Sequence, residues 1–201
     1  MFRLGAAHRR PETSGGIELV PMRRRHLKAV VEIEQQIFPT PWSLTLYLSE
    51  LSLGANRAYY VARAGNQIVG YAGLMLAVGE AHVTTIGVDP AWQRRGIGRR
   101  LLLVLATVAR QRGATDLTLE VRASNTGAQA LYHEFGFVPA GIRKNYYAEV
   151  NEDAIVMWAH DIQSSEYAER LGRIAARLAA EGGESGEGAP PEPGGQAGAA
   201  P

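Results

Sequence analysis

The sequence predicts one α+β domain in which helices flank a mixed central β-sheet. The chain has 201 residues, 46% of them hydrophobic, which suffices for one domain with its own core. Runs typical of strands and stretches with helical spacing occupy distinct parts of the chain. The first strands follow one another as a meander, whereas later strands are interspersed with helices, and this order indicates a mixed sheet.

The domain is expected to begin near Ile17 and to open with helices. Apolar residues over 27–38 recur at helical spacing, and Pro39 ends that helix. Ser43 is a suitable N-cap for a second, short helix that reaches Leu51.

An antiparallel meander is expected next. Two β-rich runs, 58–64 and 67–78, are separated by Gly65-Asn66, a hairpin signal. A third run, 82–88, closes the meander.

The second half of the domain alternates helices with strands. The expected elements are a helix over 98–112, a strand over 117–121, a helical stripe over 128–135, and strands over 137–147 and 154–161. Gly113 and Gly136 end the two helices.

The two ends of the chain differ from the domain in composition. Residues 1–16 are rich in Arg, Gly, Pro and Ser and are expected to form a flexible leader before a domain over 17–162. Apolar residues recur at helical spacing over 163–180, which predicts an additional helix. Residues 181–201 are mostly Gly, Pro, Glu and Ala, and we expect them to form a disordered tail.

Charge and cysteine content exclude several classes of function. Lys and Arg total 21 against 20 Asp and Glu, so the net charge does not favour binding to nucleic acid or to a membrane surface. The absence of cysteine excludes disulfides, thiolate metal sites and a cysteine nucleophile, and no histidine pair has metal-ligand spacing. Without a signal-like or membrane-spanning apolar stretch, the sequence predicts a cytoplasmic protein that needs no metal.

The segment Gln93-Arg94-Arg95-Gly96-Ile97-Gly98-Arg99-Arg100 lies between an expected strand and an apolar helix. A helix N-terminus presents unpaired N–H groups and the positive end of a dipole. Glycines let a phosphate approach the backbone, and arginines add charged contacts. The segment therefore predicts a site for a pyrophosphate.

Three other interpretations of this segment are possible in principle, and the sequence excludes the first of them. A Walker A loop would need a Gly-Lys-Ser/Thr ending, which is missing. A dinucleotide fingerprint would need a third glycine where Leu101 stands, and Asp89-Pro90 makes the turn too long. The third interpretation is a solvated basic helix start whose glycines serve only the turn.

Further segments resemble the GNAT superfamily and, within it, the RimI family of bacterial ribosomal-protein N-acetyltransferases. The resemblance extends over about 17–162. It rests on the loop above, on Phe38 and Pro41-Trp42 after Glu34, and on Ile86-Gly87-Val88-Asp89-Pro90, Leu119 to Asn125, Ala130-Leu131-Tyr132, Gly136-Phe137, Arg143 to Tyr147, and Glu152 to Met157.

The resemblance implies a GNAT fold in which two neighbouring strands part to admit the pantetheine arm of acetyl-CoA. By carry-over, Glu120 is the general base, Tyr132 the general acid and the Val88 N–H the oxyanion donor. Cofactor contacts are implied for Ile86, Gly87, Val88, Arg94, Arg95, Gly96, Ile97, Gly98, Arg99 and Asn125. The implied acceptor is a protein N-terminus, with the N-terminal alanine of ribosomal protein S18 favoured.

The residue types themselves support this chemistry, although Glu120 and Tyr132 each have an alternative structural role. An α-amine has a pKa near 8, so a base is useful, and Glu120 alternates with apolar neighbours on an interior strand. Its alternative role is pairing with Arg122 or a helix arginine. Tyr132 is typical of a core aromatic, yet its hydroxyl can protonate a leaving thiolate. Glu34 and Glu152 are expected to be solvated surface carboxylates.

Two other classes of function remain. A GNAT fold acting on lysine side chains or small amines would share the cofactor, and a non-catalytic acyl-CoA-binding module would share the fold. A dinucleotide-dependent oxidoreductase ranks last.

Overall fold

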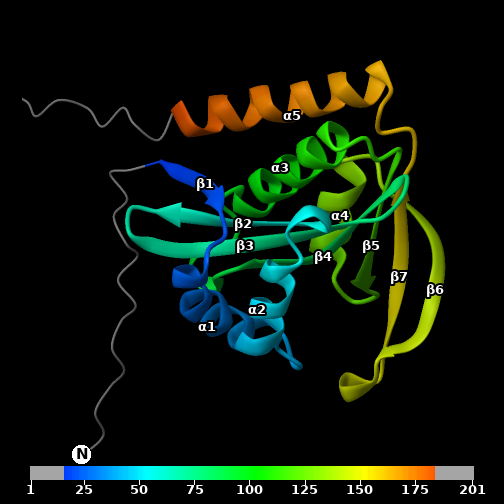
Figure 1. Ribbon diagram of the computed structural model, residues 1–201. Helices are drawn as coiled ribbons and strands as arrows, with labels where there is room; N and C mark the ends of the chain where they lie inside the picture. Colours follow the sequence, from blue (N-terminus) through cyan, green and yellow to red (C-terminus); the bar gives the residue numbers. More distant parts are fainter. Residues whose placement is uncertain (1–15, 184–201) are drawn as a thin grey trace, which may run out of the picture.

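The computed structural model describes residues 16–183. Its seven strands form one sheet in the order β1-β2-β3-β4-β5-β7-β6, with helices on both faces (Figure 1). The prediction of an α+β domain with a mixed, helix-flanked sheet is confirmed. Residues 1–15 of the predicted leader and 184–201 of the predicted tail lie outside the described residues.

The elements fall close to the predicted segments. The strands are β1 Ile17–Pro21, β2 Arg57–Ala64, β3 Gln67–Leu76, β4 Glu80–Val88, β5 Asp116–Arg122, β6 Val138–Tyr147 and β7 Glu152–Ala159. The helices are α1 Leu27–Ile37, α2 Leu44–Ser52, α3 Ile97–Gln111, α4 Thr126–Glu134 and α5 Ser165–Gly183. Strand β1 was not predicted from the sequence.

The first four strands form an antiparallel meander, and its last three, β2 to β4, are the meander that the sequence predicts. Gly65 adopts φ 57° in the β2–β3 turn, a left-handed conformation that glycine adopts without strain. The Ser43 side chain accepts a hydrogen bond from the Leu46 N–H (3.1 Å) and so caps α2.

Strands β4 and β5 are the parallel neighbours of the described sheet, and they pair only briefly. The register joins Glu80 to Asp116, Ala81 to Leu117, and His82 to Thr118, and then stops. Strand β4 continues to Val88 along β3, while β5 continues to Arg122 along β7. The middle of the sheet therefore opens into a gap between the carboxyl ends of β4 and β5.

The two faces of the sheet carry separate hydrophobic cores. Helices α3 and α5 pack on one face with the buried side chains of β5 and α4. Helices α1 and α2 cover part of the other face, as Figure 1 shows, and bury Tyr47, Tyr59 and Tyr71 between them and the meander.

Helix α5 lies along α3, where the sequence predicted an additional helix over 163–180 (Figure 1). Its buried stripe consists of Tyr167, Leu171, Ile174 and Leu178. The Arg100 guanidinium donates a hydrogen bond to the Leu178 carbonyl (2.8 Å), which fixes the end of α5 over the first turn of α3. None of the helices in the described part of the chain is long and apolar enough to cross a bilayer.

Candidate active site

The edge of β4 that faces the gap offers unpaired backbone groups. The Asp89 N–H donates to the Val69 carbonyl of β3 (3.0 Å), so Asp89 points toward β3. Because successive residues of a strand present their N–H groups to opposite edges, those of Ile86 and Val88 point into the gap. The Val88 carbonyl also turns away from β3 and accepts from the Gln93 side chain (3.2 Å).

Gly87 lies between these two residues and is in close contact with Tyr71. A Cβ atom at Gly87 would lie 2.4 Å from the Tyr71 ring and hydroxyl, far inside ordinary contact distance. Glycine is needed here because the buried Tyr71 ring packs directly on the β4 backbone.

The loop after β4 is shaped for an anion. Arg94 and Gly96 both have positive φ angles, 63° and 73°, whereas the φ angle of Arg95 between them is negative. When the φ angles of successive residues alternate in sign, their backbone N–H groups point toward a common centre. The N–H groups in the first turn of α3 also lack a side-chain cap. Arg94 and Arg95 are exposed, and the Arg95 guanidinium stacks on Trp92 (4.8 Å).

Arg99 is placed differently from the other loop arginines. Its Nε lies 3.0 Å from both carboxylate oxygens of Glu134 on α4, and its Nη1 lies 3.9 Å from Glu181 on α5. Its positive charge is thus directed at protein carboxylates. Gly98 faces Leu131 of α4, and Ile97 is buried in the core.

Glu120 lies on β5, two residues beyond the last residue paired with β4. Its side chain is 9% exposed, and its two oxygens have different partners: Oε1 lies 3.1 Å from Arg143 Nη2 and Oε2 lies 3.1 Å from His82 Nε2. Hydrogen bonding to His82 lowers the pKa of the Glu120 carboxyl, and the Arg143 charge lowers it further against the opposing effect of burial. The carboxylate is therefore ionised and held at both oxygens.

These partners are not the ones considered from the sequence, Arg122 or a helix arginine. The Arg122 guanidinium stacks instead on the rings of Tyr147 (5.0 Å) and Phe38 (6.0 Å). Sequence reasoning missed His82 because only the parallel pairing of β4 with β5 brings it beside Glu120.

Tyr132 lies on the other face of the sheet from the Glu120 side chain. Its side chain lies in the α3 and α5 core, packed on Phe137 (5.9 Å between ring centroids), and burial raises the pKa of its hydroxyl. Leu119 and Val121 belong to the same core, so Glu120 between them points to the opposite face. No hydrogen bond or ion pair joins Glu120 to Tyr132 in the region 16–183.

Asn125 begins α4, and its Oδ1 accepts from the Ala128 N–H (3.0 Å). The carboxylate of Glu152 accepts from the Ser124 N–H (2.7 Å), so it holds the β5–α4 loop, and it remains partly exposed. Both side chains therefore have structural partners beside the gap.

The expectation that Glu34 is a solvated surface carboxylate is wrong. Its side chain is 1% exposed, the Tyr47 hydroxyl donates to it (2.5 Å), and burial raises the pKa of its carboxyl. Glu34 follows Val30 at i+4 on α1, so helical spacing already placed it on the apolar face.

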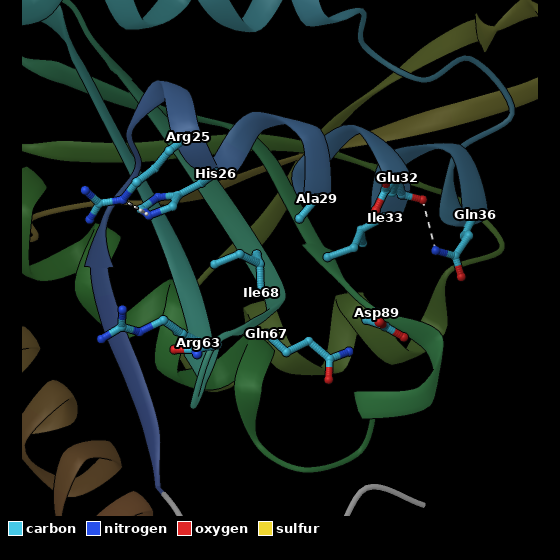
Figure 2. A pocket seen from close by; sticks show the side chains of 11 residues that line it. Arg25, His26, Ala29, Glu32, Ile33, Gln36, Arg63, Gln67, Ile68 and Asp89 are labelled. Atoms are coloured by element: carbon cyan, nitrogen blue, oxygen red, sulfur yellow. Dashed lines mark hydrogen bonds between the residues drawn. The ribbon is translucent and has the colours of Figure 1, made fainter. Parts of the chain in front are cut away.

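A separate cavity of about 460 Å³ lies between α1, the β2–β3 turn and the end of β4. Figure 2 shows Arg25, His26, Arg63 and Asp89 around it. Neither Glu120, Tyr132 nor the arginine-rich loop lines this cavity, so it is distinct from the gap. Over residues 16–183, no three His, Asp or Glu side chains are grouped to hold a metal ion.

Comparison with known proteins identifies the family. The model of the acetyltransferase (GNAT) family matches residues 27–137. The ribosomal protein bS18-alanine N-acetyltransferase of Salmonella typhimurium is 41% identical over 133 residues, 65% of this chain and 88% of the relative. The N-alpha-acetyltransferase RimI of Mycobacterium tuberculosis is 41% identical over 143 residues, 68% of this chain and 87% of the relative.

A solved structure gives the same result. The ribosomal-protein-S18-alanine N-acetyltransferase of Escherichia coli superposes with a TM-score of 0.66 at 35% identity, covering 72% of this chain and 94% of that one. The chain therefore belongs to the acetyltransferase (GNAT) family and is an N-acetyltransferase similar to RimI.

Proposed function

We propose that the protein transfers an acetyl group from acetyl-CoA to the N-terminal amine of a protein, with the N-terminal alanine of ribosomal protein S18 as preferred acceptor. The observation that carries the proposal is the parting of β4 and β5 after His82 and Thr118, with Glu120 just beyond the closed end. A relative at 41% identity that bears this activity in its name supports the choice of acceptor.

Binding would use backbone groups first. The pyrophosphate of acetyl-CoA would lie on the N–H groups of 94–99, with Arg94 and Arg95 adding charge. Arg99 would contribute its backbone, because its guanidinium is bound to Glu134. The pantetheine arm would pair with the free edge of β4 at 86–88, and Asn125 would contact it from the start of α4.

Chemistry would take place within the gap, with Glu120 near its closed end. Glu120 would accept a proton from the attacking amine, which has a pKa near 8 and is mostly protonated at neutral pH. The Val88 N–H would stabilise the oxyanion of the tetrahedral intermediate, since it is unpaired and fixed in place. Tyr132 would protonate the departing sulfur, and its raised pKa keeps the hydroxyl protonated until then.

The acceptor is tested with two peptides that share the N-terminal sequence of ribosomal protein S18 and carry one lysine. One has a free α-amine and the other has it blocked. We expect the free peptide alone to gain one acetyl group by mass spectrometry, with stoichiometric release of CoA. Acetylation of the blocked peptide would favour a lysine acceptor, and binding of acetyl-CoA without release on any amine would favour a non-catalytic module.

The base is tested with Glu120→Gln. Turnover should fall by about 10² to 10⁴, the usual contribution of acid or base assistance, while the Kd for acetyl-CoA stays the same. Glu169→Gln is the matched control, because that carboxylate is exposed on α5. Full turnover in the Glu120 variant would refute its role as the base.

A further inference from the structure

The separate cavity beside α1 has opposite charges at its two ends. Figure 2 shows Arg25, His26 and Arg63 at one end, the basic end, and Glu32 and Asp89 at the other, the acidic end. Arg25 precedes Glu32 by about two helical turns of about 5.4 Å each, so the two ends lie roughly 10 Å apart. The cavity is therefore polarised along its length.

At the basic end, the protein satisfies the Arg63 guanidinium only in part. Its Nη2 donates to Glu18 Oε2 (2.5 Å), whereas its Nε is buried and has no hydrogen-bond partner within residues 16–183. A buried donor without an acceptor costs free energy, and native structures seldom contain one. The Nε and Nη2 groups together form an edge that fits the two oxygens of a carboxylate. A turn of this side chain, which is 35% exposed, presents that edge to the cavity.

His26 contributes a second donor at the basic end. Its Nδ1 accepts from the Arg23 N–H (3.1 Å), and its Nε2 lies 3.2 Å from Arg25 Nε. Burial lowers the pKa of His26, and the charges of Arg25, Arg63 and Arg23 lower it further, so the ring is neutral at pH 7.

The hydrogen bonds of His26 determine which ring nitrogen carries the proton. A neutral imidazole has one N–H and one bare nitrogen. Because Nδ1 accepts from a backbone N–H, the hydrogen lies on Nε2, and Nε2–H faces another donor, the Nε–H of Arg25. The ring is 6% exposed, so these donors need an acceptor from the cavity. An oxyanion meets that need.

The rest of the cavity determines what the oxyanion is attached to. Asp89 Oδ1 accepts from the Ala91 N–H (2.8 Å) and keeps its negative charge, and Glu32 is exposed beside it at the acidic end. These carboxylates disfavour a phosphate, which carries more negative charge, and favour a cationic group. Between the two ends, the lining includes the apolar side chains of Ala29, Ile33 and Ile68.

We propose that this cavity binds a linear zwitterion, with its carboxylate at the basic end and its ammonium group at the acidic end. An extended tripeptide spans about 10 Å, and an ω-amino acid with a short hydrocarbon stem presents the same two groups. The volume of about 460 Å³ is within the range of small-molecule sites. The inference goes beyond the proposed function and does not depend on it.

The test is calorimetry on the full chain without acetyl-CoA, with trialanine and 6-aminohexanoate as probes. We expect at least one of them to bind, and the probe with the lower Kd identifies the stem as peptide or hydrocarbon. Removal of either charge should raise the Kd at least about tenfold. The uncharged-end analogues are N-acetyl-trialanine and trialanine amide for the first probe, and hexanoate and hexylamine for the second.

Arg63→Gln and Glu32→Gln should each raise the Kd of the zwitterion at least about tenfold. Arg57→Gln is the matched control, because Arg57 lies on the same strand as Arg63 and pairs with Glu50 (2.5 Å) but does not line this cavity. This variant should bind like the wild type. Circular dichroism establishes that each variant is folded. Trialanine also has an amine that could enter the gap, so its Kd is measured in Glu120→Gln as well and should not change.

Absence of binding by both probes up to about 10 mM would overturn the inference. Equal affinity of the wild type and Arg63→Gln would overturn it too, and so would equal affinity for trialanine and its amide. If trialanine binds less tightly to Glu120→Gln but not to Arg63→Gln, it occupies the gap. That result removes the cavity site and leaves the proposed function standing.

Discussion

Replacing Leu178 by alanine measures how much α5 contributes to the domain. The side chain is 3% exposed and its Cδ2 lies 3.4 Å from the position that a Cβ atom would take at Gly96. At about 0.8 kcal/mol per buried carbon group, deletion of the isopropyl group costs roughly 2.4 kcal/mol, and a residual cavity adds to this. A chain of this size loses about 2–4 °C of Tm per kcal/mol, so we expect a decrease of about 5–10 °C.

The assay is thermal unfolding followed by circular dichroism, combined with urea titration to separate stability from cooperativity. Leu53→Ala serves as the control, because that side chain is 49% exposed and its removal should change the stability by no more than about 0.5 kcal/mol. Equal melting temperatures for Leu178→Ala and the wild type would refute the docking of α5 on α3.

Three further predictions concern the gap and its surroundings. Gly87→Ala should cost about 1–3 kcal/mol in a urea titration, because the Tyr71 ring must move, whereas Gly141→Ala, with no atom within 4 Å of its Cβ position, should be neutral. Burial raises the pKa of Glu34 in the folded protein, so the stability it contributes is present below its ordinary pKa and lost as pH rises. Glu34→Gln should therefore exceed the wild type in free energy of unfolding at pH 8 and lose that advantage near pH 4. Arg94→Gln should raise the Kd for acetyl-CoA about tenfold, as measured by calorimetry, and this loss of affinity should be smaller at high salt. Arg24→Gln should leave the Kd unchanged.

Helices and hairpins were predictable because their signals are local. The helical spacing over 27–38 and the cap at Ser43 depend on residues within two turns of each other, and both helices lie where they were expected. The β2–β3 hairpin depends on Gly65-Asn66 alone. The short strand β1 was missed, since its five residues carry no strong period and their partner is β2, far along the chain.

Contacts at the gap were less predictable, because they depend on how distant strands pair. The spacing of Glu120 along β5 predicted the face on which it lies, but not that His82 and Arg143 would hold its two oxygens. Both partners come from other strands. Glu34 was misjudged for a different reason: a charged residue was expected at the surface, although its spacing on α1 indicated the core.

The brief pairing of β4 with β5 has a consequence for the sheet as a whole. Beyond His82 and Thr118, the backbone groups on the edges of β4 and β5 that face the gap have no partner strand, so water must solvate them until another molecule takes that place. A ligand that fills the gap completes the ladder and binds only the folded state. At a hundred times its Kd such a ligand adds about 2.7 kcal/mol of stability, so the resistance of this protein to heat should follow the concentration of its own substrate.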